Sequence, residues 1–141
     1  KKEAVIAMNS AFTGTVDAIS LEKKYGRKVL SGFVFADDVL KSKTKDFLAA
    51  LEKAYGESFN LVLKKRSVRA GMGKNRGRKY KESAGLLFVI SDKEDMKRNG
   101  IDVVKVSDLR VRDLSPNGVP GRIAAFSENS IKEIETRFKN E

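Results

Sequence analysis

The sequence predicts an α/β fold: a three-layer α/β/α sandwich with a parallel sheet of about four strands, interrupted by a basic loop rich in Gly, Arg and Lys. Four segments rich in apolar residues, typical of strands buried on both faces, occur at residues 29–35, 86–90, 101–106 and 123–126, and the one at 86–90 is continuously apolar. The second and third runs flank a segment of helical character, and such a unit implies parallel pairing with a right-handed crossover. We therefore expect the whole chain, residues 1–141, to form a single α/β domain.

Two helices are predicted at the start of the chain. Apolar side chains recur at helical spacing at Val5, Met8 and Phe12, with alanines beside them as small packing residues. A second helix is predicted over residues 17–25, and Gly26 suits the left-handed position that commonly closes a helix.

A strand and a longer helix follow. The run at residues 29–35 is rich in Val and Phe and is expected to be a strand buried on both faces. Ser42 or Thr44 can cap the next helix, which ends before Gly56. One apolar stripe marks this helix: Phe47, Leu48, Leu51, Ala54 and Tyr55.

The middle of the chain is less regular. Residues 58–65 fit either a strand or a short helix capped by Ser58, and periodicity does not decide between them. After the apolar run at 86–90, residues 92–98 are expected to form a short helical connection that ends at Asn99 and Gly100.

The C-terminal part is predicted to hold two helices around the last strand. Residues 108–114 allow at most two helical turns, because Pro116 and the residues after it favour a turn. Ser130 and Glu133 have the spacing of a capping box for the final helix. The side chains expected to face inward from this helix are Ile131, Ile134 and Phe138.

The charge of the chain is concentrated in one stretch. The sequence has 29 Lys and Arg against 19 Asp and Glu, a formal net charge of +10. Nine of the basic residues and none of the acidic ones lie within residues 64–81, so the rest of the chain is nearly neutral. A cluster of this density points to a polyanionic partner such as nucleic acid rather than to a merely solvated surface. With few large apolar side chains, the stretch is also expected to become ordered only on its partner.

Composition excludes several classes of function. The chain has no Cys and no His, so thiolate chemistry, disulfides and the commonest metal ligand and general base are all missing. Carboxylates at predicted strand ends, namely Asp37, Asp38, Asp92, Glu94 and Asp95, are more readily explained by helix capping than by catalysis or Mg²⁺ binding. We expect no cofactor, no metal and no catalytic residue.

The glycines within residues 69–80 (RAGMGKNRGRKY) match neither nucleotide-binding motif. Their spacing is G-x-G-x-x-x-G instead of the dinucleotide G-x-G-x-x-G, and Gly73-Lys74 lacks the first Gly and the final Ser or Thr of a P-loop. A mixture of Gly with Arg and Lys does suit a backbone lying against RNA phosphates, because Gly allows close approach and Arg offers forked donors to phosphate oxygens. Tyr80 is expected either to stack on a base or to hold the loop against the body.

The residues predicted to bind RNA therefore come from this single stretch. They are Lys64, Lys65, Arg66, Arg69, Gly71, Gly73, Lys74, Asn75, Arg76, Gly77, Arg78, Lys79, Tyr80 and Lys81.

Residues 69–80 also resemble the R-A-G-K-G-K-x-R-x-R-x-Y signature of a known family, the archaeal and eukaryotic form of the fourth protein of the large ribosomal subunit. Met72 stands where that family usually has a basic residue, and the chain begins at Lys1, partway along the family's sequence. The family's N-terminal strands and tunnel-directed extension are therefore expected to be missing, with the body folding without them. Other segments similar to the family are residues 100–106, 113–116, 120–122 and 127–131.

The resemblance implies a non-catalytic protein that binds large-subunit ribosomal RNA, supports ribosome assembly and contacts neighbouring ribosomal proteins. It implies a cytoplasmic location in the large subunit, with no membrane and no small-molecule substrate. Two alternatives remain open: a regulatory module that binds messenger RNA, and an α/β enzyme that acts on a phosphorylated substrate.

Overall fold

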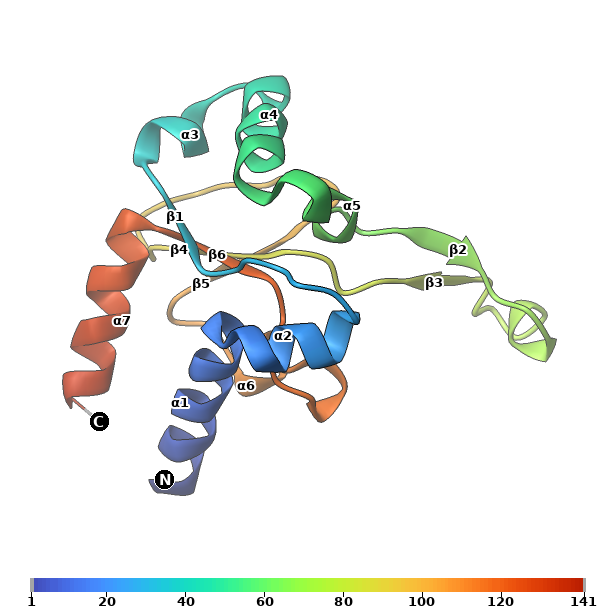
Figure 1. Cartoon of the computed structure of the whole chain (residues 1–141), viewed down its shortest axis with the longest axis horizontal. Coiled ribbons are helices and arrows are strands. Elements are labelled where there is room, and N and C mark those ends of the chain that lie inside the picture. Colours follow the sequence, from blue (N-terminus) through green and yellow to red (C-terminus); the bar gives the residue numbers. More distant parts are fainter. Residues whose placement is uncertain (1, 141) are drawn as a thin grey trace.

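The computed structural model describes residues 2–140 and confirms the predicted fold class. Its centre is a four-stranded parallel sheet with the strand order β1-β6-β4-β5. Figure 1 shows α3, α4 and α5 over one face of this sheet and α1, α6 and α7 over the other. The strands of the sheet are β1 (Phe33–Phe35), β4 (Leu87–Ile90), β5 (Asp102–Lys105) and β6 (Ala124–Ser127).

The helices form two layers, one on each face of the sheet. The layer above the sheet in Figure 1 contains α3 (Asp37–Lys41), α4 (Thr44–Tyr55) and α5 (Phe59–Val62), with a 3-10 turn, η1 (Gly56–Ser58), before α5. The layer below contains α1 (Lys2–Val16), α6 (Val111–Leu114) and α7 (Glu128–Asn140). The remaining elements are α2 (Ala18–Tyr25), the short antiparallel pair β2 (Arg66–Val68) and β3 (Tyr80–Glu82), and the 3-10 turns η2 (Met72–Lys74) and η3 (Pro116–Gly118).

The hydrophobic core is divided by the sheet into two clusters. Phe88 of β4 packs with Phe47 and Leu51 of α4 on one side. Leu87 of the same strand packs with Ala11 of α1 and Leu114 of α6 on the other. Because every residue of β4 is buried, alternate side chains serve opposite cores, as expected for a central strand of a parallel sheet.

Several local predictions are confirmed. The carboxylate of Asp17 accepts hydrogen bonds from the backbone N–H groups of Ile19 and Ser20 and so caps α2, and Gly26 closes that helix with a φ of 68°. The segment at 58–65, left open between a strand and a helix capped by Ser58, is helical at its start, in α5, but the Ser58 side chain does not cap that helix. Within residues 2–140 no single helix is long and apolar enough to cross a membrane. Only α1 and α2 together, bent by 74°, meet that length and composition.

The strand predicted at residues 29–35 is shorter and less buried than expected. β1 covers only Phe33–Phe35 and lies at the edge of the sheet, paired with β6 alone. Gly32 adopts a φ of 83° just before it, which ends the extended run on that side. Val34 keeps 51% of its surface exposed. The prediction of burial on both faces was wrong because apolar composition does not distinguish an edge strand from a central one.

The helix predicted at residues 92–98 is absent from the described structure. The connection from β4 to β5 is irregular, because side chains compete for its backbone N–H groups. Glu94 accepts a hydrogen bond from the N–H of Ser91, and the hydroxyl oxygen of Ser91 accepts one from the N–H of Lys93.

Two predicted helix caps are also wrong. Neither Ser42 nor Thr44 caps α4, which begins after Lys43 without a side-chain cap, and the Ser42 hydroxyl instead donates to Val39 O. The final helix begins one turn earlier than the Ser130 spacing suggests, and the hydroxyl oxygen of Ser127 accepts a hydrogen bond from the Ser130 N–H.

Candidate nucleic-acid interface

The basic stretch forms a hairpin arm, here defined as residues 64–83, that projects from the body. Figure 1 shows β2 and β3 leaving the amino end of the sheet side by side and extending well beyond the helical layers. The two strands pair antiparallel, with Ser67 opposite Lys81 and Val68 opposite Tyr80. Beyond them the Arg69 N–H donates to Lys79 O at 2.9 Å. The predicted loop therefore contains regular structure that its composition did not indicate.

The tip of the arm is held together by hydrogen bonds between its own backbone groups. N–H groups of η2 and the residues after it donate to Gly71 O, Met72 O and Gly73 O. Gly71 and Gly77 have φ values of 89° and 73°, a region that favours glycine. Gly73 lies inside η2 and does not have a positive φ. The residues of the tip that need a left-handed conformation therefore lie on either side of η2.

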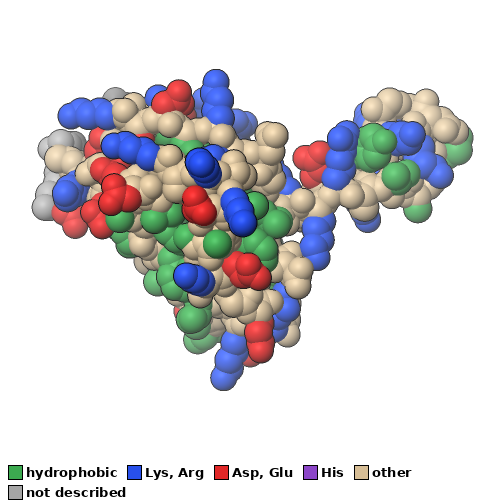
Figure 2. Space-filling view, turned by 90° about the horizontal axis from the view of Figure 1, so that it is seen from above, with side chains coloured by type: hydrophobic (Ala, Val, Ile, Leu, Met, Phe, Trp, Pro, Cys, Tyr) green, Lys and Arg blue, Asp and Glu red, His purple; other side chains and the backbone are tan. Residues whose placement is uncertain are grey.

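The arm presents its charges to solvent. Except for Gly73, every residue from Lys65 to Ser83 is exposed. Figure 2 shows the arm as a separate lobe with blue Lys and Arg side chains gathered on it. Among the described contacts, the nine cations of the stretch make two ion pairs, Arg66 with Glu82 at 3.4 Å and Lys64 with Asp102. Because Arg66 and Glu82 are both more than half exposed, their pair neutralises little of the arm's charge.

Tyr80 packs within the arm and does not hold it against the body. The Arg66 guanidinium lies 3.9 Å from the centroid of its ring, and the Lys79 ammonium lies 5.6 Å away. Arg69 Nε donates to Tyr80 O at 3.2 Å. Tyr80 is 43% exposed, so the prediction that it stacks on a base stays open.

A buried arginine holds the root of the arm to the sheet. Arg122 is 4% exposed and donates to the carbonyl oxygens of Ala84, Gly85 and Asp113 at 2.6, 3.2 and 2.8 Å. It also pairs with the carboxylate of Asp102. Since Ala84 and Gly85 immediately follow the arm, Arg122 fixes the place where the arm leaves the body.

Asp102 joins this arginine to the first residue of the arm. One of its carboxylate oxygens accepts from Arg122 and the other from Lys64. Burial by itself would raise the pKa of Asp102, but the hydrogen bonds from Lys64 and Arg122 and their positive charges outweigh it and hold the pKa below its usual value. No role was predicted for Arg122 or Asp102 from the sequence. Two charged residues beside buried apolar runs were the signal that could have identified them.

The arm is expected to exchange its amide hydrogens rapidly in the free protein. Its two strands pair with nothing but each other, and an isolated two-stranded hairpin is marginal in water. Hydrogen exchange measured by mass spectrometry should find residues 66–82 unprotected without RNA and protected with it, while β4 is protected in both. Protection of the free arm equal to that of β4 would contradict this expectation.

Three of the five carboxylates considered for catalysis, Asp37, Asp92 and Glu94, accept hydrogen bonds that join neighbouring loops. The Asn129 side-chain amide donates to both Asp37 and Glu94 at 2.9 Å, and Asp92 accepts from the Ser107 N–H. Burial would raise the pKa of Glu94, but hydrogen bonds from Asn129 and neighbouring groups lower it. Among residues 2–140 there is no group of three or more acidic side chains that could hold a metal ion. Asp38 is exposed at the start of α3.

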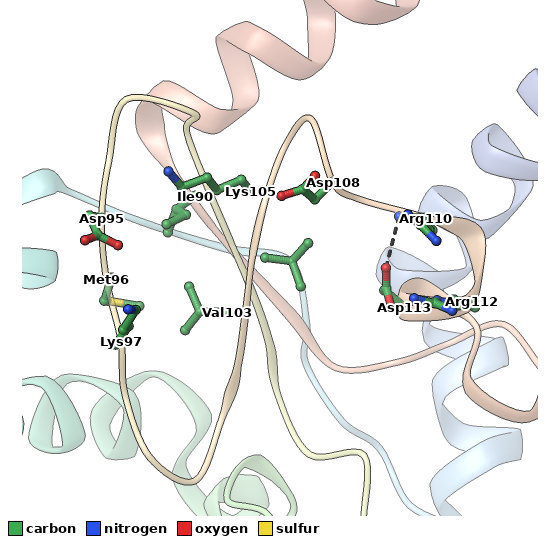
Figure 3. Close-up of a pocket in the computed structure, with 11 residues that line it drawn as sticks. Ile90, Asp95, Met96, Lys97, Val103, Lys105, Asp108, Arg110, Arg112 and Asp113 are labelled. Carbon is green, nitrogen blue, oxygen red and sulfur yellow. Dashed lines mark hydrogen bonds and ion pairs between the residues drawn. The ribbon is translucent and has the colours of Figure 1, made fainter.

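A cavity beside β5 gathers charges of both signs. Its volume is about 450 Å³, and Figure 3 shows Asp95 and Asp108 on separate loops with Lys105 between them. The backbone N–H of Arg110 donates to the Asp113 carboxylate at 3.1 Å, so that carboxylate caps α6. Basic and acidic side chains are thus mixed around this cavity.

Comparison with known proteins gives one consistent result. No family model matches the chain. The chain does match curated archaeal proteins named large ribosomal subunit protein uL4. It is 37% identical to the one from Sulfurisphaera tokodaii, 33% to the one from Methanocaldococcus jannaschii and 34% to the one from Haloquadratum walsbyi. These alignments cover 99%, 99% and 96% of this chain but 56%, 59% and 58% of the relatives. The chain thus spans a little more than half the length of the proteins it matches.

Proposed function

We propose that this uL4-type chain is a non-catalytic component of the large ribosomal subunit that binds large-subunit ribosomal RNA through its arm and supports the subunit's assembly. The observation that carries the proposal is the arm itself: a projecting hairpin that concentrates nine basic residues on a nearly neutral body. The fourteen residues predicted from sequence, from Lys64 to Lys81, all lie on this one element.

The geometry of the arm suits the interior of a folded RNA. A two-stranded hairpin is thin and presents cations along both strands, so phosphates of different RNA segments can approach it from several sides. Each Lys or Arg that neutralises a phosphate releases a counterion, and Arg also offers forked donors to phosphate oxygens. The α/β body supplies a rigid support, with Arg122 and Asp102 fixing the root.

The same proposal covers location and partners. A protein of this kind works in the cytoplasm within the large subunit, with ribosomal RNA and neighbouring ribosomal proteins around it. We also propose that the chain folds as one domain, since both cores share the same sheet.

The test is a binding comparison with the whole chain. The protein is purified at low salt and assayed for bound RNA that high salt removes, and then titrated with large-subunit and small-subunit ribosomal RNA fragments of equal length. We expect salt-removable RNA and tighter binding to a large-subunit fragment. Equal affinity for both fragments would indicate general polyanion binding. Turnover of a phosphoester that Asp92→Asn abolishes would support the enzyme alternative instead.

A further inference from the structure

We infer that a second RNA contact lies at the root of the arm, in a cavity that accepts one unstacked RNA base. The cavity has a volume of about 190 Å³ and lies between α2, α5, the residues just after β3 and the turn at Pro116 and Asn117. This inference rests on the proposed function and extends it from the arm to the body.

The walls of the cavity are mostly apolar. Tyr25 of α2, Leu61 of α5 and Pro116 line it, and Ala84 and Gly85 contribute from the segment that leads into β4. Sites that enclose a whole cofactor typically have volumes of roughly 300–1,000 Å³. A cavity this small with an aromatic and two aliphatic walls suits a single planar ring system.

Polar groups at the cavity match the edge of a base. Asn60 and Asn117 line it, and both are exposed. A side-chain amide carries both donors and an acceptor, the combination that pairs with the edge of a nucleobase.

Positive charge surrounds the cavity without any acidic counterpart among its lining residues. Lys24 and Lys65 line it, and the Lys24 ammonium donates to Val119 O at 2.9 Å. Burial and the nearby charge of Arg122 lower the pKa of Lys24, so a phosphate close by would stabilise its charged form. An apolar interior with cations around it favours a nucleotide over an isolated phosphate, which gains nothing from apolar walls.

The position of the cavity makes it continuous with the arm. Lys65 belongs to both, because its backbone N–H donates to the Ser83 hydroxyl where the two strands leave the body. An RNA strand that follows the cations of the arm toward the body therefore reaches the cavity next. A base that leaves its stack there gains an enclosed site without disturbing the phosphate contacts of the arm.

Filling the cavity tests the inference. Asn60→Trp places an indole at the cavity from an exposed helical position and removes no charge, and Asn9→Trp makes the same change on the exposed part of α1. We expect Asn60→Trp to weaken binding to the preferred ribosomal RNA fragment about tenfold, the range of one lost base stack, with the slope of log K against log salt unchanged. Asn9→Trp is expected to bind like the wild type.

A measurement on the unaltered protein accompanies the variants. Ultraviolet crosslinking of the wild-type complex followed by mass spectrometry should attach a nucleotide to the peptide that contains Tyr25. No adduct there, or wild-type affinity of a folded Asn60→Trp, would overturn the inference. A loss of affinity accompanied by a salt slope lower by one contact would overturn it too, because the cavity would then bind a phosphate and not a base.

If RNA binding responds to changes in the arm but not to Asn60→Trp, the proposed function stands and the inference fails. If the wild type shows no preference for large-subunit RNA, the proposed function itself fails.

Discussion

Replacing Arg76 and Arg78 together with alanine is expected to weaken binding to large-subunit ribosomal RNA about 40-fold at 0.1 M salt. Both side chains are exposed near the tip of the arm, and neither makes an ion pair in the described structure. If each side chain neutralises one phosphate, the slope of log K against log salt changes by about 0.8 per contact, or about 1.6 for the two. Between 1 M and 0.1 M salt, the binding constant of the variant therefore falls behind that of the wild type by roughly 1.6 powers of ten. Titrations at several salt concentrations measure the slope and the affinity together.

A charge-matched control separates this effect from that of net charge. Lys45 and Lys53 are exposed on α4, on the body, so Lys45→Ala with Lys53→Ala removes the same two charges away from the arm. We expect this variant to keep the wild-type slope. Equal losses in the two double variants would mean that the arm contributes only through total charge, and no loss in either would remove the arm from the RNA-binding surface.

Arg122→Met is expected to lower the free energy of unfolding by about 3 kcal/mol, because it removes the buried member of a partly buried ion pair and leaves three buried or partly buried carbonyl groups without their donor. Three backbone carbonyls and the Asp102 carboxylate lose a hydrogen bond at once. Since small domains are stable by only about 5–15 kcal/mol, this loss should be readily measured by urea unfolding.

Lys64→Met provides the comparison for that prediction. It breaks the other half of the same network, but the Lys64 side chain is 27% exposed against 5% for Arg122. The expected loss is about 1 kcal/mol or less, as for a solvent-accessible ion pair. Similar losses for the two variants would show that the ion pairs with Asp102, and not the carbonyl hydrogen bonds, account for the stability at the root.

The parts of the fold predicted correctly depend on signals contained within a few neighbouring residues. The continuous apolar run before Ser91 identified β4, and Asp17 and Gly26 marked both ends of α2. The errors arose where a distant residue decides the local structure. Glu133 was expected to cap its own helix, but its carboxylate accepts hydrogen bonds from Ser91 and Asp92, about 40 residues earlier.

The candidate site shows the same division. Charge density located the arm from the sequence, but not its pairing, because Val68 and Tyr80 lie in strands without the apolar alternation that marks a half-buried hairpin. The contacts of Arg122 join it to Asp102 in β5 and to Ala84 and Gly85 before β4, and these three segments meet only in the folded protein. A motif around Arg122 resembled a known family, yet nothing in its spacing indicated which groups the guanidinium binds.

The two strands of the arm leave the body as neighbours, so the arm can be replaced or changed in length at a single place. The Lys65 N–H donates to the Ser83 hydroxyl, and the Ser83 N–H donates to Lys65 O at 3.1 Å, so the entry and exit points are already joined. A hairpin of another length can grow from the same pair of residues without moving β4 or α5. The length of the arm and the stability of the body can therefore change separately, the first through insertions at the tip and the second through substitutions in the core.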